Sequence, residues 1–89
     1  MTTTRPGEDI EARILGILRQ AAGSDAVLRD PDLPLYGSGL LDSLGTVTLM
    51  AALGEELAVE VSPAEFDQEA WATPRRFVAD VRRRLEHGG

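Results

Sequence analysis

The residues best placed to do chemistry in this chain are an Asp-Ser pair, Asp42 and Ser43, that follows a glycine-rich segment at residues 37–39. The glycines permit positive φ, and the pair stands at the start of an amphipathic pattern. Asp42 can cap a helix there by accepting from the amide of Leu44 or Gly45, which stabilises a helix by about 1 kcal/mol. The hydroxyl of Ser43 is therefore predicted to be exposed at a helix start.

A serine of this kind acts as a nucleophile only when a general base lies nearby. The single imidazole belongs to His87 in a glycine-rich C-terminal tail, and the residues around Ser43 lack the Gly-x-Ser-x-Gly turn of hydrolases. Glu55 and Glu56 are expected to be solvated on a helix face rather than to form an acid-base pair. Residues 37–39 are too few, and lack the Lys, for a phosphate-binding loop. We therefore expect no catalytic residues and no intrinsic catalysis.

Ser43 is better suited to accept a modification made by another enzyme. An exposed hydroxyl at a helix N-terminus requires only steric access, and the free amides and helix dipole favour a phosphate there. These properties suit a tethering point. The residue types alone weigh this interpretation evenly against the alternative that Asp42 and Ser43 form only a helix cap.

Composition restricts the other possibilities. A chain of 89 residues is one small domain, and it has no Cys and one His, which argues against disulfides and a metal site. Its net charge of −6 arises from nine Arg and fifteen acidic residues without Lys, which disfavours nucleic acid and favours basic partner surfaces. No apolar run approaches the roughly 20 residues of a membrane span, and residues 1–7 lack a signal core. We expect a cytoplasmic monomer.

Apolar spacing predicts three main helices. The first covers about residues 8–22, begins with acidic residues and ends at Gly23. The second begins at Ser43, and the third covers about residues 74–86. Their predicted inner faces are Ile10, Ile14, Ile17, Leu18 and Ala21 in the first, Val47, Met50, Leu53 and Leu57 in the second, and Phe77, Val78, Val81 and Leu85 in the third.

The connections differ in length. Residues 24–41 form a long first loop, because two prolines interrupt any helix there. A capping box, with Ser62 at the cap, Pro63 at the first position and Glu65 closing it, predicts one short helix before Thr73-Pro74. Phe66 and Trp71 would anchor this short element. The predicted fold is all-α, a four-helix bundle of three main helices and one short helix. It is expected to form a single domain at residues 8–86, between a disordered N-terminal tail at residues 1–7 and a C-terminal tail at residues 87–89.

Gly45 and the arginine run at residues 82–84 are each interpreted from their place in a helix. Gly45 is expected to keep the surface beside Ser43 low, so that nothing crowds the hydroxyl. The run Arg82, Arg83 and Arg84 is expected to be a solvated face that matches the dipole of the last helix rather than a binding patch.

A family resemblance then becomes visible in the residues themselves. Residues 39–44, Gly-Leu-Leu-Asp-Ser-Leu, followed by an amphipathic helix resemble the phosphopantetheine attachment site of acyl and peptidyl carrier proteins. More narrowly, residues 40–47, Leu-Leu-Asp-Ser-Leu-Gly-Thr-Val, together with Glu65-Phe66-Asp67, Trp71 and Thr73-Pro74, resemble the D-alanyl carrier proteins.

The resemblance implies a carrier-protein fold in which Ser43 receives 4′-phosphopantetheine from coenzyme A through a phosphopantetheinyl transferase. Asp42 would help the transferase to engage the site. The thiol of the attached arm would take an aminoacyl or acyl group from an adenylating ligase, and an acyltransferase would remove it.

Partner enzymes are expected to dock along the helix after Ser43 and on the short helix. Leu44 and Thr48 are predicted to make apolar contact, while periodicity assigns Val47 to the core. The predicted steering charges at the rim are Glu55, Glu56 and Glu65.

The sequence leaves two alternatives for the acid that the arm would carry. The closest resemblance suggests D-alanylation of cell-wall polymers. The Arg-only, Ala-rich composition is typical of a GC-rich host, where similar stand-alone carriers serve antibiotic pathways of the polyketide or macrolactam type, and we slightly favour that role. A helical adaptor that is never modified is the alternative.

Overall fold

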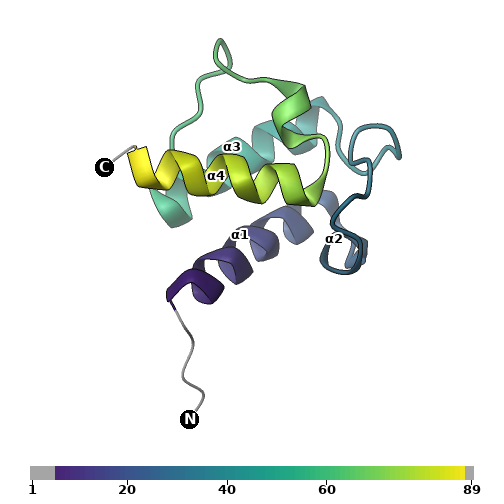
Figure 1. The fold of residues 1–89 in the computed structure, drawn as a ribbon. Helices are drawn as coiled ribbons and strands as arrows, with labels where there is room; N and C mark the ends of the chain where they lie inside the picture. Colours follow the sequence, from purple (N-terminus) through teal and green to yellow (C-terminus); the bar gives the residue numbers. More distant parts are fainter. Residues whose placement is uncertain (1–5, 88–89) are drawn as a thin grey trace.

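Helices form all the regular secondary structure of the computed structural model, which describes residues 6–87 (Figure 1). The three long helices are α1 (Pro6–Ala22), α3 (Ser43–Leu57) and α4 (Pro74–His87). Two short elements are α2 (Ala26–Arg29) and a 3-10 helix, η1 (Gln68–Trp71). No strand occurs within residues 6–87, so the predicted all-α fold is confirmed.

Helix α1 is the element against which α2, α3 and α4 all pack. Ile14, Ile17 and Leu18 of its predicted stripe are buried, as the spacing requires. The helix ends at Gly23, whose φ is +70° and whose amide donates to the carbonyl of Arg19 at 2.8 Å. The predicted glycine cap is therefore confirmed.

The helix boundaries differ slightly from the predicted ones. Helix α1 begins at Pro6 rather than Glu8, because the fixed φ and missing N–H of proline suit the first helical position. Helix α4 extends to His87. The rest of the predicted tails, residues 1–5 and 88–89, lies outside the described residues. The predicted disorder of the N-terminal tail and the domain limits 8–86 therefore stay predictions.

The long first connection contains a helix that the spacing did not indicate. Helix α2 is only one turn long, and the hydroxyl of Ser24 accepts from the amide of Ala26 at 3.1 Å just before it. A single turn has little intrinsic stability. Burial of Val27 against α1 therefore holds it, a tertiary contact that local pattern cannot reveal.

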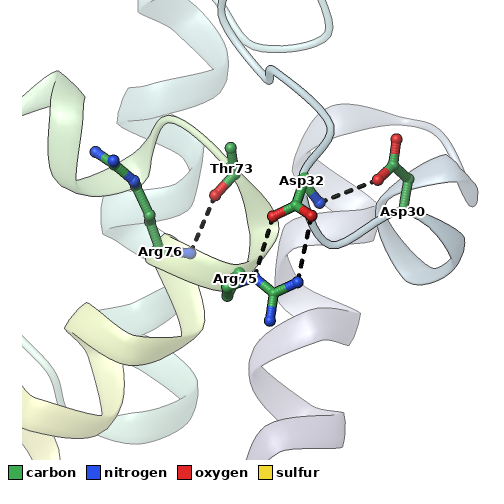
Figure 2. A network of polar contacts seen from close by, with 5 residues as sticks. All are labelled: Asp30, Asp32, Thr73, Arg75 and Arg76. Carbon is green, nitrogen blue, oxygen red and sulfur yellow. Dashed lines mark hydrogen bonds and ion pairs between the residues drawn. The ribbon is translucent and has the colours of Figure 1, made fainter.

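This connection is also fastened to the start of α4. The amide of Leu35 donates to the carbonyl of Ala72 at 2.8 Å, and the amide of Arg75 donates to the carbonyl of Pro31 at 2.9 Å. Figure 2 shows the guanidinium of Arg75 facing the carboxylate of Asp32, with N···O distances of 3.1 and 3.3 Å. Arg75 holds the pKa of Asp32 below its usual value. The loop that precedes α3 thus has a fixed position relative to α4.

In α3 the predicted inner face is wrong at one position. Val47 is 60% exposed, whereas Thr46 is 6% exposed and the helix buries Leu49 and Leu53. Thr46 tolerates burial because its hydroxyl bonds to two oxygens, the carbonyl of Asp42 at 2.9 Å and the hydroxyl of Tyr36 at 2.7 Å. An apolar pattern cannot anticipate those partners.

The predicted short helix lies later than expected. Ser62 caps only a turn, in which its hydroxyl accepts from the amide of Ala64 at 3.2 Å and its carbonyl from that of Glu65 at 2.9 Å. The capping-box prediction at Ser62 is therefore wrong. The short helix is η1, begun by Asp67, whose carboxylate accepts from the amide of Glu69 at 3.0 Å. Trp71, buried at the end of η1, fixes it on α4.

Candidate functional site

The start of α3 is built by Asp42. Its backbone is extended, and its Oδ1 accepts from the amide of Gly45 at 2.8 Å, which confirms the predicted cap. Ser43 is therefore the first residue of the helix, and its side chain is exposed. The amides of Ser43 and Leu44 have no hydrogen-bond partner within the described part of the chain. They are two of the free donors that a helix start offers to an anion.

Ser43 differs from the other serines in what its hydroxyl does. The hydroxyl oxygen of each of the other three, Ser24, Ser38 and Ser62, accepts from a nearby backbone amide in a turn. The hydroxyl of Ser43 makes no hydrogen bond to any of residues 6–87. It is an exposed oxygen that no turn or cap requires.

A groove of about 450 Å³ adjoins this hydroxyl. Its walls come from three separate parts of the chain, namely the first loop, the start of α3 with its cap, and the segment around the start of η1. The lining residues are Tyr36, Asp42, Ser43, Thr46, Phe66 and Gln68.

Two of the lining residues, Tyr36 and Thr46, are joined through their hydroxyl groups. Thr46 donates its only hydroxyl proton to the carbonyl of Asp42, so in the 2.7 Å contact Tyr36 donates to Thr46. Burial raises the pKa of Tyr36 above its ordinary value although the bond to Thr46 opposes this, so the phenol stays neutral at physiological pH. Its oxygen retains its acceptor capacity on the groove side.

Phe66 is a second aromatic side chain in the lining of the groove. The ring of Phe66 lies 5.1 Å from that of Trp71, and Trp71 lies 5.0 Å from Phe77, both in edge-to-face arrangements. Trp71 and Phe77 are buried. Phe66 is therefore positioned by the core although it is itself only partly buried, as the sequence predicted for these anchors.

Next to Trp71 lies a buried carboxylate that the sequence analysis did not single out. The indole Nε1 of Trp71 donates to Oδ2 of Asp80 at 2.9 Å, and Nε of Arg84 donates to the same oxygen at 2.8 Å. Arg83 pairs with the other oxygen. Burial alone would raise the pKa of Asp80, but its bonds to Arg84, Trp71 and Arg83 hold that pKa below the usual value.

The arginine run therefore does more than face solvent. Arg83 and Arg84 contact Asp80, and Nη1 of Arg82 lies 3.6 Å from Oε1 of Glu11 in α1. The side chain of Arg84 is only 23% exposed. Arg82 and Arg83 are exposed, as expected of a solvated face, whereas Arg84 is partly buried, and Arg83 and Arg84 together neutralise a buried acid.

Gly45 also has a different role from the predicted one. A Cβ atom at this position would lie 3.1 Å from Cδ2 of Leu41 and 3.4 Å from Oδ1 of Asp42. The glycine faces the packed side of the helix start. It therefore makes room for Leu41 and the cap, rather than keeping the outer surface low.

The predicted partner-binding residues are all exposed but do not form one cluster. Leu44, which is 75% exposed, and Thr48 lie one turn apart near Ser43, and Val47 stands beside them. Glu55 and Glu56 belong to the far end of α3, and the helical rise of 1.5 Å per residue separates the backbone of Glu55 from that of Ser43 by about 18 Å. Glu65 belongs to the turn before η1. Sequence periodicity missed Val47, which extends the apolar surface around Leu44.

Residues 6–87 contain no group of three or more His, Cys, Asp or Glu side chains able to hold a metal ion. Within the same range no helix combines the length and the apolar character needed to cross a membrane.

Comparison with known proteins agrees with the geometry of the α3 start. A protein-family model described as "Phosphopantetheine attachment site" matches residues 12–81, which contain both the capped helix start and the groove. The chain belongs to this family of carrier domains. Its members carry 4′-phosphopantetheine attached covalently to a serine.

Individual carrier proteins are also similar. The D-alanyl carrier protein of Enterococcus faecalis is 37% identical over 73 residues, which cover 82% of this chain and 94% of that protein. The D-alanyl carrier protein of Lacticaseibacillus casei is 43% identical over 74 residues, covering 83% and 91% respectively. That of Bacillus velezensis is 36% identical over 70 residues, covering 79% and 90%.

The site fits the cofactor of the carrier family. A phosphodiester on the hydroxyl of Ser43 would lie beside the two unpartnered amides of the first turn. The hydroxyl is exposed, so a modifying enzyme can reach it. No rearrangement of the helix cap is needed, because Asp42 caps through Gly45 and not through Ser43.

Proposed function

We propose that this chain is an aminoacyl carrier protein in which Ser43 bears the phosphopantetheine arm. The observation that carries the proposal is the hydroxyl of Ser43, exposed at the capped start of α3 and free of hydrogen bonds to residues 6–87. Membership of the carrier family supplies the cofactor, and the contrast with Ser24, Ser38 and Ser62 supports the choice of serine.

Attachment would be a phosphoryl transfer performed by a separate phosphopantetheinyl transferase. The oxygen of Ser43 forms a bond to phosphorus while the bond from that phosphorus to the nucleotide half of coenzyme A breaks, and the serine proton passes to a base of the transferase. Asp42 would assist by presenting its carboxylate beside the attachment point. The arm supplies a thiol for thioester formation, which a chain without Cys lacks.

The remaining chemistry would belong to partner enzymes, an adenylating ligase that loads the thiol and an acyltransferase that unloads it. The carrier itself would perform no catalysis. We propose that the partners contact Leu44, Val47 and Thr48 near the arm, because Leu44 and Val47 are large apolar side chains left exposed. Glu55, Glu56 and Glu65 would steer association through charge, so reversing Glu55 and Glu56 should slow it and weaken its salt dependence.

D-alanine is the cargo that the similar proteins favour, since the three described above are D-alanyl carrier proteins. A role in antibiotic assembly, which composition slightly favours, would use the same arm with another acid. We further propose that residues 8–86 act as one monomeric domain in the cytoplasm, where coenzyme A is available.

The attachment is tested by intact mass after incubation with coenzyme A and a broad-specificity transferase. The mass of the protein should rise by one phosphopantetheine, and Ser43→Ala should abolish the rise. Ser38→Ala and Ser62→Ala are matched controls that should retain it, since both residues are exposed serines outside the helix start. Retention of the rise in Ser43→Ala would assign the arm to another residue, and no rise in the unaltered protein would favour the unmodified helical adaptor.

The cargo is tested on the modified protein. Incubation with ATP, a panel of adenylating ligases and single amino acids should yield a D-alanyl thioester if the role of the relatives is shared. Loading by another acid alone would favour the antibiotic role.

A further inference from the structure

We propose that the first half of the phosphopantetheine arm lies in the groove beside Ser43, against the rings of Phe66 and Tyr36 and the side-chain amide of Gln68. This inference rests on the proposed attachment to Ser43. It adds a resting place for the arm that the attachment itself does not require.

Continuity is the first argument. Ser43 is one of the residues that line the groove, so a group on its hydroxyl begins inside it. The free amides of Ser43 and Leu44 would hold the phosphate at this end. The volume of about 450 Å³ lies within the roughly 300–1,000 Å³ of ordinary small-molecule sites.

Chemical complementarity is the second argument. After its phosphate the arm carries a dimethyl-substituted carbon, a hydroxyl and then amides, so that apolar and polar groups alternate. The groove offers groups of both kinds, because the rings of Tyr36 and Phe66 line it together with the polar side chains of Thr46 and Gln68. The side-chain amide of Gln68 makes no hydrogen bond within residues 6–87, so its donor and acceptor are both available.

Rigidity of the walls is the third argument. Tyr36 is fixed by its hydrogen bond to Thr46, and Phe66 is fixed by its contact with the buried Trp71. The backbone bond from Leu35 to Ala72 holds the loop that carries Tyr36. Ordering of the groove therefore costs little when the arm binds. Because the groove is open on one side, the arm can leave when a partner enzyme takes up the thiol.

The proposal is tested by NMR on the protein modified with phosphopantetheine that carries ¹³C in its two methyl groups. Nuclear Overhauser effects are expected between these methyl groups and the ring protons of Phe66. Modification should also shift the side-chain amide signals of Gln68, which is distant in sequence from Ser43.

Gln68→Ala supplies the variant, and Gln20→Ala is its matched control, because Gln20 is the other glutamine of the chain, is exposed and does not line the groove. Loss of one neutral hydrogen bond should lower the ratio of groove-bound to free arm about two- to tenfold in Gln68→Ala. The ratio should be unchanged in Gln20→Ala.

Mass measured on the same samples separates the two proposals. If phosphopantetheine is present on Ser43 but the methyl groups show no contact to Phe66 and shifts are confined to residues 42–45, the arm is free in solvent. The groove proposal is then overturned while the carrier function stands. If no sample is modified, both are overturned.

Discussion

The starts of α3 and α4 use the same capping device in opposite surroundings. In α3, Oδ1 of Asp42 accepts from the amide three residues on at 2.8 Å, and in α4 the hydroxyl of Thr73 accepts from the amide of Arg76 at 3.2 Å. The residue after the cap is Ser43 in α3, which is exposed, and Pro74 in α4, which is buried. A cap therefore satisfies the backbone at either place, and the surroundings decide whether the next side chain can be reached.

The difference shows a division of labour. The α4 start is held on one side by the first loop, through the bonds from Leu35 to Ala72 and from Arg75 to Pro31. Trp71 supports it from the interior. The α4 start therefore has a structural role. It holds the first loop and, through Trp71, the ring of Phe66, so that neither covers the start of α3. The following changes should act on one start and not on the other.

Trp71→Ala should have the largest effect. Truncation of this fully buried side chain should lower the free energy of unfolding by about 3–5 kcal/mol, because it leaves a cavity beside α4. Urea unfolding followed by circular dichroism measures the loss. Trp71→Phe is the control that keeps a buried ring but removes the donor to Asp80, and it should cost less. A loss below 1 kcal/mol in Trp71→Ala would show that the α4 start does not depend on this support.

The second-largest effect should be a loss of folding stability at low pH, through protonation of Asp80. Its pKa is lower in the folded protein than in the unfolded chain, so its contribution to stability is fully present above the ordinary pKa of about 3.9 and is lost as pH falls through the folded value. Asp80→Asn should lower the free energy of unfolding by about 1–3 kcal/mol at pH 7 and make it less dependent on pH between about 4 and 2. Urea midpoints measured across this range test the sign. An unchanged pH dependence in Asp80→Asn would assign the acid sensitivity to other carboxylates.

The two caps should give matched losses of stability but different losses of modification. Asp42→Ala and Thr73→Ala should each lower the free energy of unfolding by about 1 kcal/mol, since each removes one capping acceptor. Only Asp42→Ala should also slow the attachment of phosphopantetheine. Asp42→Asn separates the two roles, because Asn caps as well as Asp but carries no charge. If Asp42→Asn is modified at the full rate in the mass assay, the charge of Asp42 does not assist the transferase.

The pair of Arg75 and Asp32 should have the smallest effect. Both side chains are largely exposed, and an exposed ion pair is weak in water. Asp32→Asn should therefore leave the urea midpoint unchanged at physiological salt, and hydrogen exchange should show the amide of Leu35 still protected by its bond to Ala72. Loss of that protection would mean that the ion pair, not the backbone, fastens the first loop.

Local patterns predicted most of the features that depend on local physics. The spacing of apolar residues located α1, α3 and α4, and residue types identified the caps at Gly23 and Asp42 together with the exposed hydroxyl of Ser43. Each of these depends on residues within a turn or two of one another.

The errors come from contacts between distant residues. Thr46 is buried in place of Val47 because the phenol of Tyr36, ten residues earlier, forms a hydrogen bond with the hydroxyl of Thr46. The turn at Ser62 does not continue as a helix, because the chain reaches its buried anchor only at Trp71. The groove has walls from three segments, so no single stretch of sequence could indicate it.

Trp71 is the single tryptophan of the chain. Its ring contacts two phenylalanine rings, and its indole N–H donates a hydrogen bond to the carboxylate of Asp80. This environment makes the protein a built-in fluorescent sensor, since indole emission responds to the polarity and charge around the ring. Phe66 links that ring to the groove, so emission would respond to occupancy without any added dye. Entry of the arm into the groove and its departure could then be followed by stopped-flow fluorescence in the unlabelled protein.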